Sequence, residues 1–140
     1  MRVFIDAPLF IYLNTLANSS YRALYENFYI GVLTEHKPYT DVLVLDELIY
    51  ISKKKYGIPY DVTIEFIQSV ILPYVSILNL SEEEYNNAVK ILTKYSLKPS
   101  DALHLGAMMS NGINVIVSEG KEYDRVSTIK RIWIDNPHPT

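Results

Sequence analysis

The stretch from residue 98 to residue 131 constrains the fold most, because it joins a predicted helix, a buried strand and an acidic loop. Ser100 is predicted to be the N-cap of the helix, with Asp101 in its first turn, and Asn111-Gly112 ends the helix. Residues 113–117 form a largely apolar, β-branched run, which is typical of a strand covered on both faces. Because ligands in open α/β sheets bind just beyond the carboxyl ends of strands, we expect Asp101 to meet the acids of the following loop. These acids are Glu119, Glu122 and Asp124.

The rest of the chain repeats this alternation of short apolar runs and helical patterns. Strands are predicted at residues 2–5, 75–78, 113–117 and 131–134, and amphipathic helices lie between them. This order predicts an α/β fold with a parallel sheet covered on both faces. A length of 140 residues predicts a single domain, residues 1–140. The residues after Ile134 are expected to fray.

Composition excludes several classes of protein. A hydrophobic share of 49% with 21% charged residues is that of a globular protein. The absence of cysteine excludes disulfides and thiolate metal sites, and no apolar run has the roughly 18 residues of a membrane span. Since the N-terminus also lacks a signal-peptide pattern, we expect a cytoplasmic protein. A net charge of −3 argues against nucleic-acid binding by bulk positive charge but leaves local basic patches open.

Two acids outside this stretch occupy informative positions. Asp6 follows the first predicted strand, where it serves either as a functional carboxylate or as the cap of the next helix, and the sequence leaves both readings open. Glu47 lies among apolar and aromatic residues three and four positions away, and Asp46 has similar neighbours. A buried carboxylate is unfavourable unless something pairs with it. We therefore expect either Asp46 or Glu47 to face inward.

A convergence of these acids would create a cluster of like charges, which stays ionised only when a cation neutralises it. With oxygen ligands and no cysteine, the cluster indicates Mg²⁺ or Mn²⁺ rather than Zn²⁺. Such ions typically serve phosphate chemistry. The sequence contains no glycine-rich phosphate loop and no Gly-x-Ser-x-Gly elbow, which argues against an NTPase and against an α/β-hydrolase.

Four segments of the chain together resemble the PIN domain family, and in particular the ribonuclease toxins of VapBC toxin–antitoxin pairs. They are FIDAPLFIY, VLDELIYI, PSDALHLGAM and NVIVSEGKEYDRVSTIKRI, in the order and approximate spacing of the family. The resemblance covers essentially the whole chain. It implies a three-layer α/β/α fold, metal-dependent endoribonuclease activity, a homodimer, and an antitoxin that inserts a segment into the acidic groove. It also makes Asp6, Glu47 and Asp101 the catalytic and metal-binding acids, with Glu47 rather than Asp46 as the second.

The chain departs from the family pattern in two places. Ala7 and Pro8 follow the first acid, where the family often has a small polar residue and then Asn. Gly120 stands where the family has an acid or Asn. Either the site holds one metal ion, or a neighbouring acid supplies the missing oxygen, the candidates being Glu119, Glu122 and Asp124. The alternative function is a catalytically weakened PIN fold that binds RNA or protein. A receiver-type phosphoacceptor domain fits the order of elements less well.

The remaining candidates concern substrate. Ser118 is expected to contact substrate or to orient a water or a ligand carboxylate, although an ordinary strand-end hydroxyl is an equal alternative. Lys121 and Arg125 are expected to contact RNA phosphates. The basic residues Lys53, Lys54, Lys55, Lys130 and Arg131 could join them as a group. His104 lies one helical turn after Asp101 and could touch a phosphate, but a hydrogen-bonded core histidine is the more common case.

Overall fold

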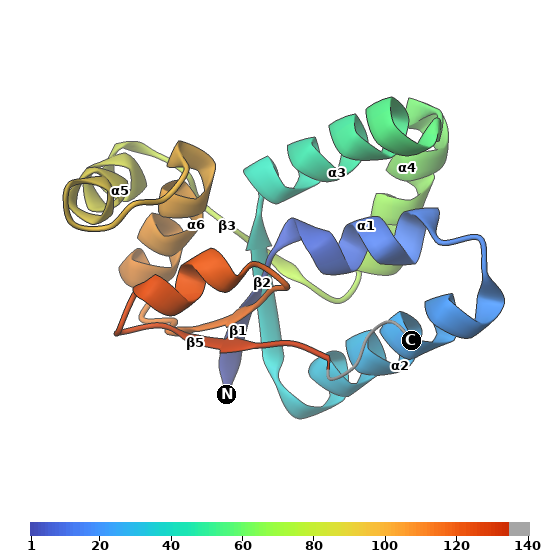
Figure 1. The fold of residues 1–140 in the computed structure, drawn as a ribbon, viewed down its shortest axis with the longest axis horizontal. Coiled ribbons are helices and arrows are strands. Elements are labelled where there is room, and N and C mark those ends of the chain that lie inside the picture. Colours follow the sequence, from blue (N-terminus) through green and yellow to red (C-terminus); the bar gives the residue numbers. More distant parts are fainter. Residues whose placement is uncertain (135–140) are drawn as a thin grey trace.

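The computed structural model describes residues 1–134, which form a parallel sheet between two layers of helices (Figure 1). The elements in chain order are β1 (Arg2–Ile5), α1 (Ala7–Thr15), α2 (Ser19–Glu35), β2 (Lys37–Asp41), α3 (Val42–Tyr56), α4 (Tyr60–Phe66), the π-helical turn η1 (Ile67–Ile71), β3 (Ser76–Leu78), α5 (Glu82–Lys94), α6 (Pro99–Ser110), β4 (Val115–Val117), the 3₁₀ turn η2 (Lys121–Arg125) and β5 (Lys130–Ile132). The three-layer α/β/α fold expected from the sequence is confirmed. The fraying expected after Ile134 lies outside the described residues.

The strand order β3-β2-β1-β4-β5 explains where a site can form. All four strand pairings are parallel. From β1 the chain proceeds to β2 and β3 on one side, and it later returns to β4 and β5 on the other. Figure 1 accordingly shows α1 to α4 on one side of the sheet and α5 and α6 on the other. Between β1 and β4 the connections diverge, and this switch point is where ligands bind in open α/β folds.

The sheet contains five strands rather than the four predicted. The strand β2 was missed because its sequence, Lys-Pro-Tyr-Thr-Asp, reads as a helix end followed by a cap. Proline is unusual inside a sheet because it cannot donate a ladder hydrogen bond. Here β3 pairs with β2 only from Tyr39 onward, so Pro38 has a neighbouring strand on one side only. Asp41 is the N-cap of α3, and it also ends this strand.

The core confirms the strand predictions and corrects two helix predictions. Strands β1 and β4 are buried, with Phe4 and Ile116 fully inaccessible. The helix α6 begins earlier than predicted, since Lys98 and not Ser100 is its N-cap and Pro99 occupies its first turn. Helical spacing predicts that Tyr85, Ala88, Val89 and Leu92 form the buried face of α5. Only Ala88 of these is buried, together with Ile91, and the other three are exposed.

The helices α5 and α6 pack closely because Gly106 has no side chain. A Cβ atom at this position would lie 2.5 Å from the backbone oxygen of Glu84 and 3.1 Å from the backbone nitrogen of Ala88. This contact fixes α6, which carries Asp101 and His104, against its neighbour. No helix within residues 1–134 combines the length and the apolar character that crossing a membrane requires.

Candidate metal centre at the switch point

Asp6 lies where β1 ends and α1 begins, at the switch point of the sheet. Its Oδ1 atom accepts a hydrogen bond from the backbone N–H of Ala7 at 2.9 Å, and Pro8 occupies the first turn of α1. The side chain is only 5% exposed. The helix-cap reading of Asp6 is therefore confirmed, and the same buried carboxylate also lies at the switch point.

Ser118 follows β4, the strand next to β1, and supports the Asp6 carboxylate. Its hydroxyl donates to Asp6 Oδ2 at 2.8 Å and accepts from the backbone N–H of Gly120 at 3.0 Å. The residue is fully buried. The prediction of Ser118 as a substrate contact is therefore not supported, because its hydroxyl is inaccessible and engaged, whereas the expected orientation of a ligand carboxylate fits this geometry.

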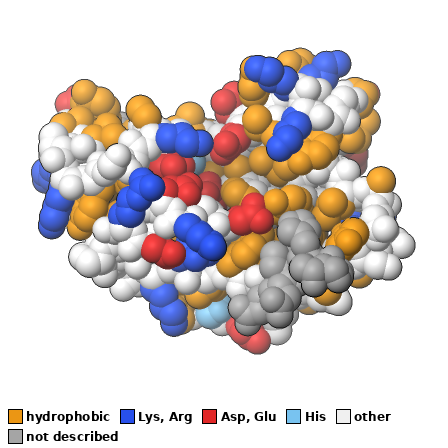
Figure 2. Space-filling view, in the orientation of Figure 1, with side chains coloured by type: hydrophobic (Ala, Val, Ile, Leu, Met, Phe, Trp, Pro, Cys, Tyr) orange, Lys and Arg blue, Asp and Glu red, His pale blue; other side chains and the backbone are white. Residues whose placement is uncertain are grey.

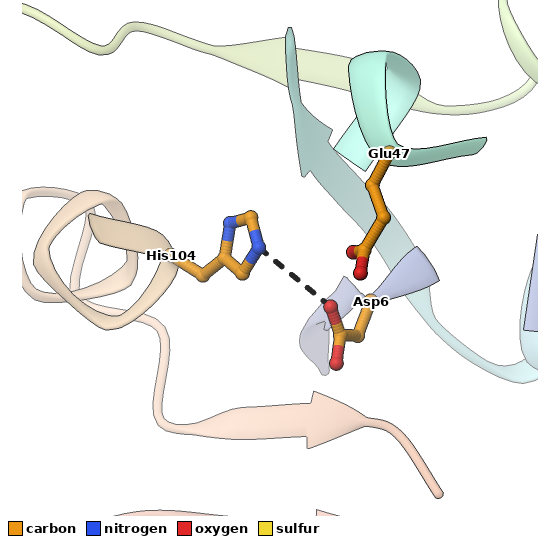
Figure 3. Close-up of side chains that lie close together, drawn as sticks. All are labelled: Asp6, Glu47 and His104. Carbon is orange, nitrogen blue, oxygen red and sulfur yellow. Dashed lines mark ion pairs between the residues drawn. The ribbon is translucent and has the colours of Figure 1, made fainter. Parts of the chain in front are cut away.

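Glu47 and His104 converge on Asp6 from two different helices. Ligand atoms of these three side chains all lie within 4.8 Å of one another. Figure 3 shows Glu47 reaching down from α3 and the ring of His104 facing Asp6 from α6. His104 Nε2 lies 3.7 Å from Asp6 Oδ1. Glu47 and Asp46 are both exposed, so neither is buried as the sequence led us to expect, and only Glu47 contributes a ligand atom to this group.

Asp101 lies on α6, one turn before His104, and is held by Tyr123. The Tyr123 hydroxyl donates to Asp101 Oδ1 at 2.9 Å. Asp101 Oδ2 is buried and has no hydrogen-bond partner among residues 1–134. Asp101 lies outside the group of three ligands within 4.8 Å, but its charge raises the pKa of Glu47, and the charge of Asp6 raises the pKa of Asp101. A buried carboxylate oxygen without a donor is unfavourable and suits a cation.

The three candidate acids of the loop after β4 have different surroundings. Glu119 accepts a hydrogen bond from the Tyr12 hydroxyl at 2.7 Å. Asp124 is exposed and forms a two-bond ion pair with Arg131, at 3.0 Å and 3.1 Å. Glu122 lies against Gly120, where a Cβ atom would fall 2.4 Å from Glu122 Oε1. The carboxylate of Glu122 thus fills the space into which a side chain at position 120 would project.

Basic side chains border the acidic hollow. Figure 2 shows red acidic side chains gathered in a depression between two raised parts of the surface, with blue Lys and Arg side chains around it. Lys121 and Arg125 are exposed, and Arg125 donates to the Ser96 carbonyl at 2.6 Å. The charge of Lys98 lowers the pKa of Glu47, which puts this residue near the site although the sequence reading omitted it.

Burial and mutual repulsion raise the pKa values of two acids of the site, Glu47 and Asp101. Burial, followed by the charge of Asp6, raises the pKa of Glu47 above its ordinary value, and the charge of Asp101 adds to this. Burial also raises the pKa of Asp101, against the lowering effect of the Tyr123 hydrogen bond, and Asp6 and Glu122 raise it further. Burial would lower the pKa of His104, but its hydrogen bond to Asp41 and the charges of Asp41, Asp6 and Asp101 raise it. The site resists the accumulation of negative charge, and a divalent cation would relieve this.

The raised pKa of Glu47 predicts that Glu47→Gln changes the stability of the metal-free protein, measured in chelator, in a pH-dependent way. A carboxyl group with a raised folded-state pKa stabilises folding below its unfolded pKa, about 4.3, and this contribution is lost as the pH rises through the folded pKa. The variant should therefore melt above the wild type near neutral pH, and the gap should close as the pH falls towards about 4. Thermal melts of both proteins across this range measure the gap. A gap that widens towards acid pH would contradict the shift.

The donor set fits a divalent cation, and the sequence reading missed one member of it. Asp6 and Glu47 supply carboxylates, and Asp101 supplies a buried oxygen without a donor. The sequence favours a hydrogen-bonded core histidine over a phosphate contact for His104, yet its ring faces Asp6. Its spacing of three residues from Asp101 puts both on one face of a helix, which was the available signal. Its partner Asp41 could not be found because β2 was not recognised.

Comparison with known proteins agrees with this geometry. The family model of the PIN domain matches residues 3–129. The chain is similar in structure to VapBC from Salmonella typhimurium bound to DNA (TM-score 0.71, 15% identity, covering 95% of this chain and 98% of that one). It is also similar to VapBC2 from Rickettsia felis bound to a fragment of promoter DNA (0.70, 16%, 96% and 100%). A third is VapC20 of Mycobacterium tuberculosis, a toxin that cleaves the sarcin–ricin loop (0.68, 13%, 87% and 93%). No curated protein matches the chain in sequence. Since the family match spans most of the chain, this protein belongs to the PIN domain family.

Proposed function

We propose that this protein is a VapC-type toxin, a cytoplasmic endoribonuclease that hydrolyses RNA phosphodiester bonds with Mg²⁺ or Mn²⁺. The observation that carries the proposal is the approach of Asp6 and Glu47 at the switch point of the sheet, with ligand atoms within 4.8 Å of each other, and with Asp101 near enough for its charge to raise the pKa of Glu47. These residues come from three separate parts of the chain. Their repulsion is unfavourable for the protein alone and becomes useful when a divalent ion is bound.

In this proposal the side chains divide into ligands and supports. Asp6, Glu47 and Asp101 would hold the ion, which when bound lowers the pKa of a coordinated water and neutralises charge on the phosphoryl group. Ser118 and the N–H of Ala7 fix the Asp6 carboxylate, and Tyr123 fixes Asp101. Burial and nearby acids raise the pKa of Tyr123, so its hydroxyl remains a donor. Asp6 and Asp101 therefore need little rearrangement on binding.

Glu122 is our candidate for the carboxylate that Gly120 does not provide. Of the three loop acids, Glu119 is bonded to Tyr12 and Asp124 to Arg131, whereas Glu122 occupies the space beside Gly120. The charge of Glu122 also raises the pKa of Asp101, which indicates that it faces the same region. We propose one ion with Glu122 at its margin, and we leave Glu119 and Asp124 out of the ligand set.

A double-mutant cycle tests whether Glu122 supplies the carboxylate that position 120 lacks. Glu122→Ala should weaken Mn²⁺ binding by roughly one order of magnitude, because the number of carboxylates sets affinity. Gly120→Asp alone should change the affinity little, because the new acid displaces the flexible Glu122 carboxylate from the same space. The pair Gly120→Asp with Glu122→Ala should recover most of the affinity, since the new acid enters the vacated space. Calorimetric titration measures each variant, and strictly additive losses would exclude this role of Glu122.

The basic residues at the rim suit phosphates on either side of the scissile bond. Lys121 and Arg125 are exposed beside the acidic loop, and the proximity of Lys98 to Glu47 adds a third cation. Such contacts position RNA and carry little sequence information. Arg131 is a weaker candidate because Asp124 engages its guanidinium.

The similarity to VapBC structures supports an antitoxin partner for this chain, and we also propose the homodimer that the family resemblance implies. Three of the structures similar to it are toxin–antitoxin complexes from Rickettsia felis, Klebsiella pneumoniae and Salmonella typhimurium. A small DNA-binding protein encoded beside this one should copurify with it and suppress its activity. Light scattering of the purified protein tests the dimer.

Removal of the metal distinguishes two hypotheses: that the protein is a metal-dependent enzyme, and that it is a PIN-fold module that only binds RNA. The enzyme should cut single-stranded RNA with Mn²⁺ or Mg²⁺ and lose cleavage in chelator, with recovery when metal is restored. A binding module would retain RNA, insensitive to chelator, without cutting it. Structured and unstructured RNAs, followed by gel electrophoresis with and without chelator, distinguish these outcomes. Cleavage that persists unchanged in chelator would contradict the metal-dependent proposal.

A further inference from the structure

His104 is the most tightly fixed side chain beside the acids of the site. It is 1% exposed, and its ring lies 5.4 Å from the ring of Phe4. Its Nδ1 atom lies 2.7 Å from Asp41 Oδ2, within a fully buried pair. A short contact to a buried carboxylate places a proton on Nδ1. The ring is therefore held in one orientation, with Nε2 directed towards Asp6.

The position of Nε2 is that of a ligand rather than of a core side chain. It lies 3.7 Å from Asp6 Oδ1, which is too long for a hydrogen bond, and it belongs with Glu47 to the group within 4.8 Å (Figure 3). Two atoms bound to one ion at ligand distances of about 2.0–2.2 Å stand about 3–4 Å apart. The spacing of Nε2 and Oδ1 matches that of two such ligands.

Asp41 connects His104 to the helix that carries Glu47. Its Oδ2 atom pairs with His104, while Oδ1 accepts from the backbone N–H of Val44 at 3.0 Å. Glu47 lies one turn beyond Val44 on α3. A single buried carboxylate thus fixes the start of α3 and the ring on α6. Carboxylate–histidine pairs of this kind commonly orient metal-binding imidazoles.

We propose that His104 is a nitrogen ligand of the metal ion, positioned by Asp41, and that it makes the site prefer Mn²⁺ over Mg²⁺. This inference rests on the proposed metal-dependent function and deepens it. Mg²⁺ favours oxygen ligands in an octahedral shell that keeps several waters. Mn²⁺ is also bound by oxygen ligands, but as a first-row transition ion it accepts an imidazole nitrogen more readily than Mg²⁺ does. A site of carboxylates alone would discriminate less between the two ions.

The test begins with the wild-type protein, which needs no substitution. Electron spin-echo spectroscopy of Mn²⁺ bound to the full chain should show modulation from a coordinated nitrogen, and labelling histidine with ¹⁵N should change that modulation. His104→Gln should abolish it. His36→Gln is the matched control, because it removes a histidine at the end of α2, outside the ligand group, and should leave the modulation unchanged.

Calorimetry then measures selectivity for the two ions. His104→Gln should weaken Mn²⁺ binding by about 100-fold or more, beyond the roughly 10–100-fold typical of a lost supporting contact, and should leave Mg²⁺ binding nearly unchanged. Asp41→Asn keeps the helix cap but weakens the hold on Nδ1, so it should reduce Mn²⁺ affinity by roughly tenfold. Circular dichroism confirms that each variant folds.

The outcomes distinguish this inference from the proposed function. Histidine-dependent modulation together with lost Mn²⁺ selectivity in His104→Gln supports it. Mn²⁺ binding without nitrogen coupling, and unchanged in His104→Gln, overturns it and leaves the carboxylate site standing, with His104 as a counter-charge to the acids. A wild-type protein that binds neither ion overturns both.

Discussion

Replacing Asp6 by Asn is expected to lower the rate of RNA cleavage by about 10²–10⁴-fold. Asp6 is the acid on which Glu47 and His104 converge, and Ser118 fixes its carboxylate. Metal assistance supplies several kcal/mol of transition-state stabilisation, and each 1.36 kcal/mol corresponds to about tenfold in rate. Single-turnover cleavage of a labelled RNA at saturating Mn²⁺ measures the loss.

Two comparisons separate this effect from a loss of folding. Asn caps helices about as well as Asp, and it removes one of the repelling charges, so the variant in chelator should melt at or above the wild-type temperature. Asp46→Asn removes an exposed acid adjacent to Glu47 and outside the ligand group, and should retain activity. Equal losses in Asp6→Asn and Asp46→Asn would contradict the assigned site.

Gly106→Ala is expected to destabilise the protein by about 1–3 kcal/mol, the usual range for overpacking. The added Cβ would stand 2.5 Å from the backbone oxygen of Glu84, and backbone cannot rotate away as a side chain can. The helices α5 and α6 would have to separate. The melting temperature should fall by roughly 4–12 °C.

Gly31→Ala is the matched control for this prediction. Gly31 lies within α2, and a Cβ there would meet no atom within 4 Å. The same chemical change should therefore stabilise the protein by about 0.4–1 kcal/mol, since alanine loses less backbone freedom on folding. Thermal melts of both variants decide the matter. Two shifts of the same sign would contradict the close packing of α5 on α6.

The fold was largely predictable where hydrophobic pattern and position agree. Strands β1 and β4 are short apolar runs, and the acid after β1 identified the switch point. Strand β2 was not predictable because it contains Pro38 and because its pairing with β1 is set by tertiary context. The prediction placed Tyr85 and Leu92 on the buried face of α5 because both are apolar and have helical spacing from the buried Ala88. In the structure both side chains are exposed.

The site was predictable in its acids and not in their partners. Asp6 and Glu47 were found from an acid at a strand end and from a carboxylate among apolar neighbours, with the family resemblance choosing Glu47 over Asp46. The support that Ser118 gives to Asp6 joins residues 112 positions apart, and the His104–Asp41 pair joins residues 63 positions apart. No local pattern reports such contacts, because only the order of the strands brings them together.

Anomalous diffraction from crystals containing Mn²⁺ tests the central claim most directly. The account predicts one strong peak at the carboxyl ends of β1 and β4, within ligand distance of an Asp6 oxygen and bordered by Glu47 and Asp101. Asp6→Asn should remove the peak without altering the fold. A peak elsewhere, or none at saturating Mn²⁺, would contradict the account.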